Sequence, residues 1–226
     1  MSLTVKTVTY CADTVPLNDR ELYGRFYLEM PDYRRSKIDY LAFDKDRIQS
    51  MGVEILLRRA LEDHGVDYRS LDISTGRYGK PYFNGCGLCF NLSHSEERVM
   101  CSVSEDDVGC DVEKVHTIDL EIARRYFFGS EYETICSEKD PERRYDLFFR
   151  FWTLKESFMK ATGLGFELPL DSFRIELGDR ITVDQKVDGR DYRFMEYTLS
   201  DGYCYAVCSP DGSFEPTIRN IDLRGC

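Results

Sequence analysis

Two acidic residues alternate in the stretch VGCDVE, at Asp111 and Glu113. If this stretch is a β-strand, the two carboxylates share one face, while Val108, Cys110 and Val112 share the other. The α-carbons of the acidic pair would lie about 7 Å apart, so both carboxylates could reach one cation. Oxygen ligands without a neighbouring histidine or thiol favour a hard ion such as Mg²⁺. An ordinary solvated strand face would have the same spacing.

A second group of charges lies within an apolar segment, FRFWTLKESFMK, residues 149–160. On a helix of about 100° per residue, the apolar side chains occupy a wide arc that includes Lys155 and Glu156. Buried charges need partners, because desolvating an unpaired charge is unfavourable. One explanation is a local i,i+4 pair between Glu156 and Lys160, which leaves Lys155 unexplained. The other is a cleft in which Glu156 is a third carboxylate on the cation and the lysines face phosphate.

Further polar residues stand where a ligand could reach them. Ser93 and His94 follow an apolar strand in FNLSHS, and Lys80 stands in GRYGKP, where glycine lets the backbone approach a ligand closely. Arg47 lies at the start of a long predicted helix. Taken singly, each is typical of a solvated charge or a structural histidine. Together with the carboxylates they suggest a site for a metal-bridged pyrophosphate. More anion contacts could come from an earlier basic cluster: Arg34, Arg35 and Lys37.

The elements that must position these residues follow from the periodicity of the chain. LNDRELYGRFYLEM is predicted to be a helix capped by Asn18, and DKDRIQSMGVEILLRRALEDHG is predicted to be a longer amphipathic helix that Gly65 ends. The turn residues SEDD predict a hairpin between the last two of the predicted strands. These strands are LTVKTVTY, CGLCFNLSHS, RVMCSVS and DVGCDVEKV.

The second half repeats the pattern of the first. DLEIARRYFFGSEYETICSEKD is predicted to be helical with a break at Gly129, and the next helix is expected from Tyr145 to Thr162. The remaining segments alternate like antiparallel strands: DSFRIEL, RITVDQ and RFMEYTLSDGYCYAVCS. Each half thus offers a long helix and several strands. This predicts an α+β protein of two similar lobes, residues 1–107 and 108–226.

Composition narrows the classes of protein. With 226 residues, of which 42% are hydrophobic and 13% aromatic, the chain can bury a substantial core. The formal net charge of −11 argues against a general affinity for nucleic acid, so a polyanionic ligand needs a local basic pocket. No apolar run of about 18 residues occurs, and the start of the chain lacks the apolar stretch of a secretory signal. We expect a cytoplasmic protein with no membrane partner.

Nine cysteines are present, and Cys86 and Cys89 form a C-x-x-C. This spacing could indicate zinc, but no second pair stands at matching spacing. The alternative is that the cysteines pack as small apolar side chains in strands and core.

The order of the motifs resembles a known family. GKP, FNLSHS, VGCDVEKV and FWTLKESFMKATGLGFELPLDSF are similar to the motifs of the surfactin-type (Sfp-type) 4′-phosphopantetheinyl transferases. The resemblance runs from about Pro31 to Ser209. Its most specific part is G-x-D-x-E followed by W-x-x-K-E-S-x-x-K. The family is a pseudo-twofold pair of α+β lobes in one chain, with coenzyme A in the cleft between them.

The resemblance implies a reaction. A serine of an acyl or peptidyl carrier protein attacks the β-phosphorus of coenzyme A, and adenosine 3′,5′-bisphosphate leaves. Asp111, Glu113 and Glu156 would hold Mg²⁺, and Glu156 would also deprotonate the serine, either directly or through a metal-bound water. Lys160 would stabilise charge on the phosphate oxygens, supported by Lys155. The remaining contacts to coenzyme A would come from Ser93 and His94, near the 3′-phosphate, and from Lys80 and Arg47, at the adenine or phosphate end.

Two positions depart from the family pattern. Glu96 and Ser102 stand where the family usually carries glycine and alanine. Two other functions remain as alternatives, namely a catalytically silent coenzyme A or nucleotide-binding protein and a Mg²⁺-dependent hydrolase of pyrophosphates. Because a two-lobe chain already contains a complete cleft, we expect a monomer.

Overall fold

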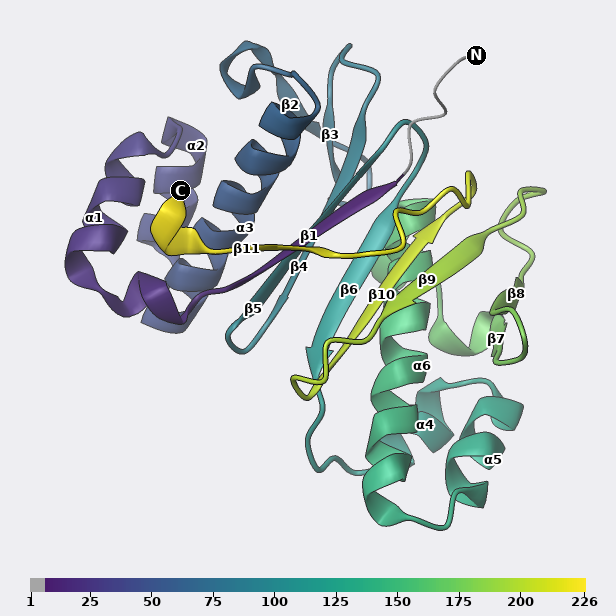
Figure 1. Cartoon of the computed structure of the whole chain (residues 1–226). Helices are drawn as coiled ribbons and strands as arrows, with labels where there is room; N and C mark the ends of the chain where they lie inside the picture. Colours follow the sequence, from purple (N-terminus) through teal and green to yellow (C-terminus); the bar gives the residue numbers. More distant parts are fainter. Residues whose placement is uncertain (1–6) are drawn as a thin grey trace.

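Two long helices each cover one face of a sheet (Figure 1). The computed structural model describes residues 7–226, so residues 3–6 of the predicted strand LTVKTVTY lie outside the described range. The helices are α1 Arg20–Glu29, α2 Asp32–Tyr40, α3 Asp44–Asp63, α4 Glu121–Tyr126, α5 Gly129–Ser137 and α6 Pro141–Thr162. The strands are β1 Val8–Asp13, β2 Ile73–Thr75, β3 Pro81–Phe83, β4 Cys89–Ser95, β5 Arg98–Ser104, β6 Gly109–Lys114, β7 Arg174–Glu176, β8 Thr182–Asp184, β9 Arg193–Tyr197, β10 Tyr203–Ser209 and β11 Arg219–Ile221.

The two lobes have the same topology. In each, a first strand is followed by short helices, one long helix, a small hairpin and a larger hairpin whose second strand pairs with the first strand. The strand order β1-β5-β4 of the first lobe therefore corresponds to β6-β10-β9 of the second. Helix α3 packs on the first sheet and α6 on the second. The predicted α+β fold with a pseudo-twofold pair of lobes is confirmed.

Some helix ends lie where the sequence predicts them, and others are shifted. Gly65, in a left-handed conformation with φ of 69°, follows the end of α3 as predicted. The cap of α1 is Asp19 rather than Asn18, because the Asp19 carboxylate accepts the backbone N–H groups of the first turn. Helix α6 begins at Pro141, one turn before the predicted Tyr145, and its N-cap is Asp140.

The predicted hairpin at SEDD is wrong. Strand β5 pairs with β1 and β4, whereas β6 pairs with β10 in the other sheet. SEDD therefore carries the chain from one lobe to the other. The hairpin of this region lies earlier, between β4 and β5, where Glu96 takes a positive φ of 48°. SEDD contains turn-forming residues, whereas the turn between β4 and β5 consists of Glu96 and Glu97, so local turn chemistry favoured the wrong connection.

The sheets meet along strands β4 and β6, which run close to each other. An apolar cluster lies between the lobes and takes residues from both sheets, including Cys11 of β1, Val112 of β6 and Val207 of β10. At the edge of this cluster, side chains of β4 bind backbone amides of β6. We call this line of contacts the seam. The pairs are Asn91 with Cys110, Ser93 with Val112, and Ser95 with Lys114.

Helix α6 lies directly on β6. A Cβ atom added at Gly109 would stand 2.0 Å from the Ser157 carbonyl oxygen and 2.3 Å from the Ala161 amide nitrogen. Only glycine permits this approach, which accounts for the first residue of the G-x-D-x-E motif. The close contact places the side chains of α6 beside the next residues of β6.

The end of the chain returns to the first lobe. Strand β11 pairs in parallel with β1, and Leu223 is fully buried in the core of the first lobe. The expected division at residues 107 and 108 therefore does not describe this last segment, because it contributes to the sheet and core of the opposite lobe.

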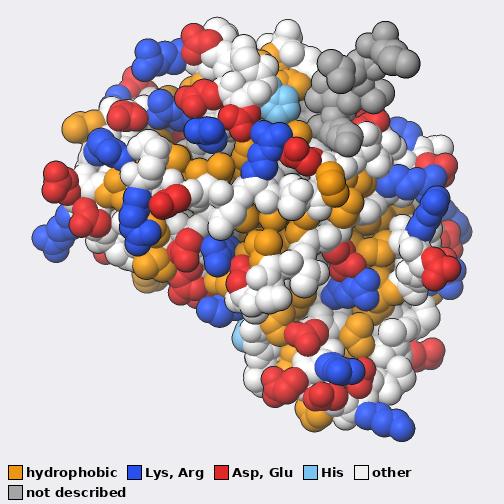
Figure 2. Space-filling model, in the orientation of Figure 1, with side chains coloured by type: hydrophobic (Ala, Val, Ile, Leu, Met, Phe, Trp, Pro, Cys, Tyr) orange, Lys and Arg blue, Asp and Glu red, His pale blue; other side chains and the backbone are white. Residues whose placement is uncertain are grey.

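Acidic residues outnumber basic residues in the chain, 41 to 30. On the face shown in Figure 2, acidic and basic side chains are interspersed. Among residues 7–226, none of the helices combines the length and the apolar character that a membrane crossing requires.

Candidate active site

Strand β6 presents its acidic side chains toward α6. Asp111 bonds to Lys160 of α6, whereas Cys110 and Val112 pack into the cluster between the lobes. The predicted alternation, with the carboxylates of Asp111 and Glu113 on one face and the apolar residues on the other, is thus confirmed.

Asp111 is the centre of a buried polar network. Its Oδ1 atom accepts hydrogen bonds from Lys160 Nζ at 2.6 Å and from Ser93 Oγ at 2.7 Å. Its Oδ2 atom is buried and has no hydrogen-bond partner among the described residues. Lys160 also donates to the Cys110 carbonyl at 3.2 Å. Burial would lower the pKa of Lys160, but the charge of Asp111, the hydrogen bond to Asp111 and the nearby Cys110 and Glu156 together outweigh burial and raise it, so the ammonium form is favoured.

Glu156 joins this network from α6. Its side chain is 8% exposed, and its Oε1 atom is buried without a partner in residues 7–226. Burial, followed by the charge of Asp111, raises the pKa of Glu156 to about 7, against the opposing effect of Lys160. Burial and Asp111 also raise the pKa of Glu113. The three carboxylates are therefore close enough to influence one another, although Lys160 pairs with Asp111 and not with Glu156.

The donor set suits a hard cation. Two buried carboxylate oxygens without partners, Asp111 Oδ2 and Glu156 Oε1, are atoms that a divalent ion would satisfy. As arranged here, no group of three or more His, Cys, Asp or Glu side chains in the described part of the chain could hold a metal ion. The Lys160 ammonium lies at Asp111 instead. The cysteines of the C-x-x-C pack against different apolar clusters.

Lys155 lies away from this network, in the core of the second lobe. It is 0% exposed, and its ammonium pairs with Glu131 of α5 at 2.8 Å. It also donates to the carbonyls of Leu170 at 2.8 Å and Phe173 at 3.0 Å. Three partners satisfy all three N–H groups. This position disagrees with the prediction that Lys155 supports binding of coenzyme A. Glu131 was not predicted as its partner because the two residues are distant in sequence.

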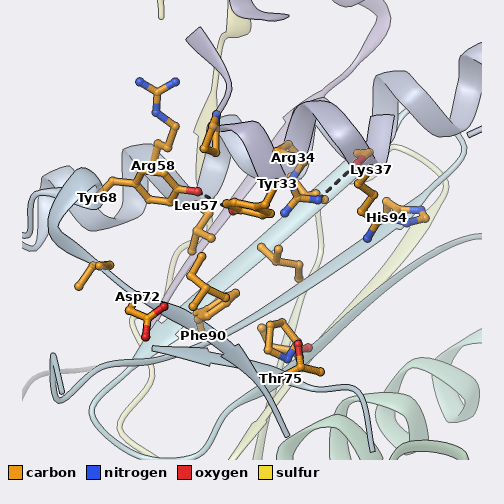
Figure 3. A pocket seen from close by; sticks show the side chains of 18 of the residues that line it. Tyr33, Arg34, Lys37, Leu57, Arg58, Tyr68, Asp72, Thr75, Phe90 and His94 are labelled. Carbon is orange, nitrogen blue, oxygen red and sulfur yellow. Dashed lines mark hydrogen bonds between the residues drawn. The ribbon is translucent and has the colours of Figure 1, made fainter. Parts of the chain in front are cut away.

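A cavity of about 1130 Å³ lies in the first lobe. Helix α3 and strand β4 form its floor, and its walls are α2 on one side and the β2–β3 region on the other. Figure 3 shows His94 and Lys37 at one end and Tyr68 and Arg58 at the opposite end. The lining residues are all from the first lobe, between Glu29 and His94, so the cavity stands beside the carboxylates rather than around them.

His94 lines the cavity and lies close enough to the carboxylate network to be affected by its charges. The ring is exposed at the cavity, yet the surrounding protein desolvates it and lowers its pKa, with further lowering by the charges of Lys160 and Lys37. Ser93, predicted as its companion, points to the opposite face of β4 and donates to Asp111. Strand alternation therefore separates the two residues, and only His94 lines the cavity.

The three basic residues of α2 also differ in position. Arg34 and Lys37 line the cavity, whereas Arg35 pairs with Asp32 at the surface. Arg34 pairs with Glu54 of α3, which accepts its Nε–H at 2.7 Å. The phenols of Tyr33 and Tyr68 also donate to Glu54. This buried carboxylate in the middle of α3 was not predicted, since its partners come from two other elements, α2 and the turn that begins at Tyr68.

Two other predicted contacts lie outside the cavity lining. The Lys80 ammonium donates to the carbonyls of Val108 at 3.0 Å and Ala161 at 3.2 Å, so it ties the first lobe to the residue before β6 and to α6. Arg47 donates to the Leu41 carbonyl and pairs with Asp44. Their positions do not support direct contact with a ligand in the cavity.

Glu96 is the acidic residue that stands where the family usually carries glycine, and its charge is offset by an ion pair. Its carboxylate pairs with Lys45 of α3 at 2.8 Å, and its carbonyl accepts from Gln49 at 2.8 Å. The pair with Lys45 offsets its negative charge beside the cavity. Ser102, the other departure from the family pattern, bonds to Thr9 across the first sheet at 2.9 Å.

Comparisons with known proteins show which family this chain resembles. Residues 107–208 match the model of the 4′-phosphopantetheinyl transferase superfamily. The 4′-phosphopantetheinyl transferase Sfp of Bacillus subtilis (strain 168) is 31% identical over 213 residues, which are 92% of this chain and 94% of that protein. The 4′-phosphopantetheinyl transferase gsp of Aneurinibacillus migulanus is 34% identical over 73% of this chain and 70% of that protein.

The fold, the carboxylate network and the matched region together have the character of a phosphopantetheinyl transferase. More particularly, the chain belongs to the Sfp-type 4′-phosphopantetheinyl transferase family, as its similarity to Sfp over nearly the whole of both chains shows.

Proposed function

We infer that this chain transfers the 4′-phosphopantetheine arm of coenzyme A to a serine hydroxyl of an acyl or peptidyl carrier protein. The observation that carries this inference is the convergence of Asp111 and Glu113 of β6 with Glu156 of α6, beside Lys160. The names of the similar transferases support the reaction class. The basic end of the cavity, with Lys37 and His94, adjoins the same network.

We propose further that Asp111, Glu113 and Glu156 hold Mg²⁺. The two buried oxygens without partners support this assignment. When bound, Mg²⁺ would offset the charge of the pyrophosphate and polarise its oxygens. Because Lys160 now binds Asp111, metal binding is expected to displace the ammonium from that carboxylate.

The residues have distinct roles in the transfer. The serine oxygen forms a bond to the β-phosphorus, and the bond from this phosphorus to the bridging oxygen breaks, so adenosine 3′,5′-bisphosphate leaves with the electron pair. Glu156 accepts the serine proton as the general base. Lys160 stabilises negative charge on the phosphoryl oxygens.

The cavity of the first lobe is the proposed site of the nucleotide. Lys37, Arg34 and His94 would face its phosphate groups, and the neighbouring backbone at Gly79 and Pro81 also lines the space. Ser93 is assigned instead to Asp111, to which it donates. We assign Lys80 and Arg47 structural roles, on the basis of their bonds to backbone carbonyls.

The test is intact-mass measurement of apo carrier proteins incubated with the protein, coenzyme A and Mg²⁺. We expect a mass gain of one phosphopantetheine, and no gain with Glu156→Gln or with EDTA. Release of bisphosphate without a carrier would instead identify a hydrolase. Binding of coenzyme A without release under any condition would identify a silent binding protein.

We also propose that the chain acts as a monomer, because the carboxylates, Lys160 and the cavity all come from one chain. Light scattering coupled to size-exclusion chromatography at the concentration of the assay checks this. An activity that rises with the fraction of dimer would contradict it.

A further inference from the structure

The seam between the lobes has a regular register. Asn91 Oδ1 accepts the Cys110 N–H at 2.8 Å, Ser93 Oγ accepts the Val112 N–H at 3.3 Å, and Ser95 Oγ accepts the Lys114 N–H at 3.2 Å. Alternate residues of β4 thus meet alternate residues of β6. Side-chain oxygens here take the place of the carbonyls of a neighbouring strand.

The same hydroxyls reach the acidic residues of β6. Ser93 Oγ donates to Asp111 Oδ1 at 2.7 Å, and Ser95 Oγ donates to Glu113 Oε2 at 2.7 Å. A serine hydroxyl has a single proton. Because the oxygen of Ser95 accepts an amide, its proton is directed to the carboxylate.

Glu113 depends on this contact more than Asp111 depends on Ser93. Within residues 7–226, Glu113 forms no ion pair, and Ser95 is the one hydrogen-bond donor to its side chain. Asp111, by contrast, is held by both Lys160 and Ser93. The hydroxyl of Ser95 therefore fixes the orientation of an otherwise unanchored carboxylate.

We propose that Ser95 is a positioning residue that sets the Glu113 carboxylate for a divalent cation, an inference that rests on the proposed function. Ser95 would act through Glu113 and would not touch the ion. Partners of metal-binding carboxylates orient the ligand before the ion arrives, which reduces the ordering that binding requires. The seam would thereby serve two purposes, joining the lobes and orienting the carboxylates of the second lobe.

The experiment is a titration of the protein with Mn²⁺, followed by electron paramagnetic resonance of the free ion, without coenzyme A or carrier. We expect Ser95→Ala to weaken Mn²⁺ binding by about tenfold. Ser95→Thr keeps the hydroxyl, and a β-branched residue suits a strand, so binding close to wild type is expected. Thermal unfolding shows whether each variant is folded.

Asn91→Ala is the matched control. It removes a seam hydrogen bond to Cys110 but no contact with a carboxylate, because the residue of β6 that corresponds to Asp111 and Glu113 at this register is Gly109. We expect a lower melting temperature and Mn²⁺ binding close to wild type. An effect on Mn²⁺ as large as that of Ser95→Ala would overturn the proposal, since loss of the seam alone would then explain both.

Other outcomes are also decisive. The proposal fails if Ser95→Ala binds Mn²⁺ like the wild type, or if Ser95→Thr is as weak as Ser95→Ala. Absence of Mn²⁺ binding by the wild-type protein would overturn the metal assignment and this role together. Failure of carrier modification, with the pattern of Mn²⁺ binding intact, would overturn the proposed transfer and leave the role of Ser95 standing.

Discussion

Two lysines of α6 differ in environment although they are five residues apart. Lys155 is fully buried beside Glu131, and the Phe173 ring centroid lies 4.2 Å from its ammonium. The Lys160 side chain is 26% exposed and reaches Asp111. One lysine therefore belongs to the core and the other to the site.

This contrast predicts opposite phenotypes. Lys155→Met leaves Glu131 buried without its cation, so we expect the free energy of unfolding to fall by about 3–5 kcal/mol. Lys160→Met is expected to change the stability far less but to lower carrier modification by at least about 100-fold. Denaturant unfolding and intact-mass assays of both variants check this. Loss of activity in a stable Lys155→Met protein would place that lysine back in the site.

The stability of the folded protein is expected to depend on pH through Glu156. Its pKa in the folded protein is raised from 4.5 to about 7, so the native state favours the protonated form. The contribution of Glu156 to the free energy of unfolding is therefore fully present below pH 4.5 and is lost as the pH rises through about 7. In EDTA, the wild type should therefore lose stability relative to Glu156→Gln, by on the order of 2 kcal/mol, between about pH 5 and about pH 8.

Denaturant unfolding of both proteins at the two pH values measures this difference. Mg²⁺ should reduce it by neutralising the carboxylates. A difference that is the same at both pH values would contradict the coupling of Glu156 to its neighbours.

At the scale of elements, the contact of α6 with β6 sets the distance between the residues of the site. Gly109→Ala would force a methyl group against the backbone of α6 at Ser157 and Ala161. We expect a loss of at least about 2 kcal/mol in the free energy of unfolding, together with loss of transfer. Gly129→Ala is the control, because nothing lies within 4 Å of a Cβ atom there. A stable, active Gly109→Ala protein would show that the helix can move without harm.

The sequence predicts those features that depend on local periodicity. The strand alternation placed Asp111 and Glu113 on one face, and the apolar arc of the 149–160 segment indicated that Lys155 and Glu156 are buried. Periodicity does not reveal long-range partners. The pairing of Lys155 with Glu131, and the bonds of Lys80 to carbonyls beside β6 and in α6, therefore could not be predicted. For the same reason, the sequence did not distinguish the SEDD crossing from a hairpin.

At the scale of the whole molecule, the last segment joins the lobes. Leu223 is fully buried against the first lobe, while Arg224 is exposed. Leu223→Ala should lower the free energy of unfolding by about 2–5 kcal/mol, and Arg224→Ala should change it by less than about 0.5 kcal/mol. Thermal or denaturant unfolding distinguishes them. Equal effects would mean that the segment does not contribute to the core.

Strand β11 also has a consequence for biosynthesis. Arg219 meets Tyr10 across a separation of 209 positions, so the ribosome must translate nearly the whole sequence before β1 acquires this neighbour. Until then one margin of the first sheet stays uncovered, and such margins are templates for association between chains. Nascent or prematurely terminated polypeptides should therefore need chaperone protection that the finished protein does not.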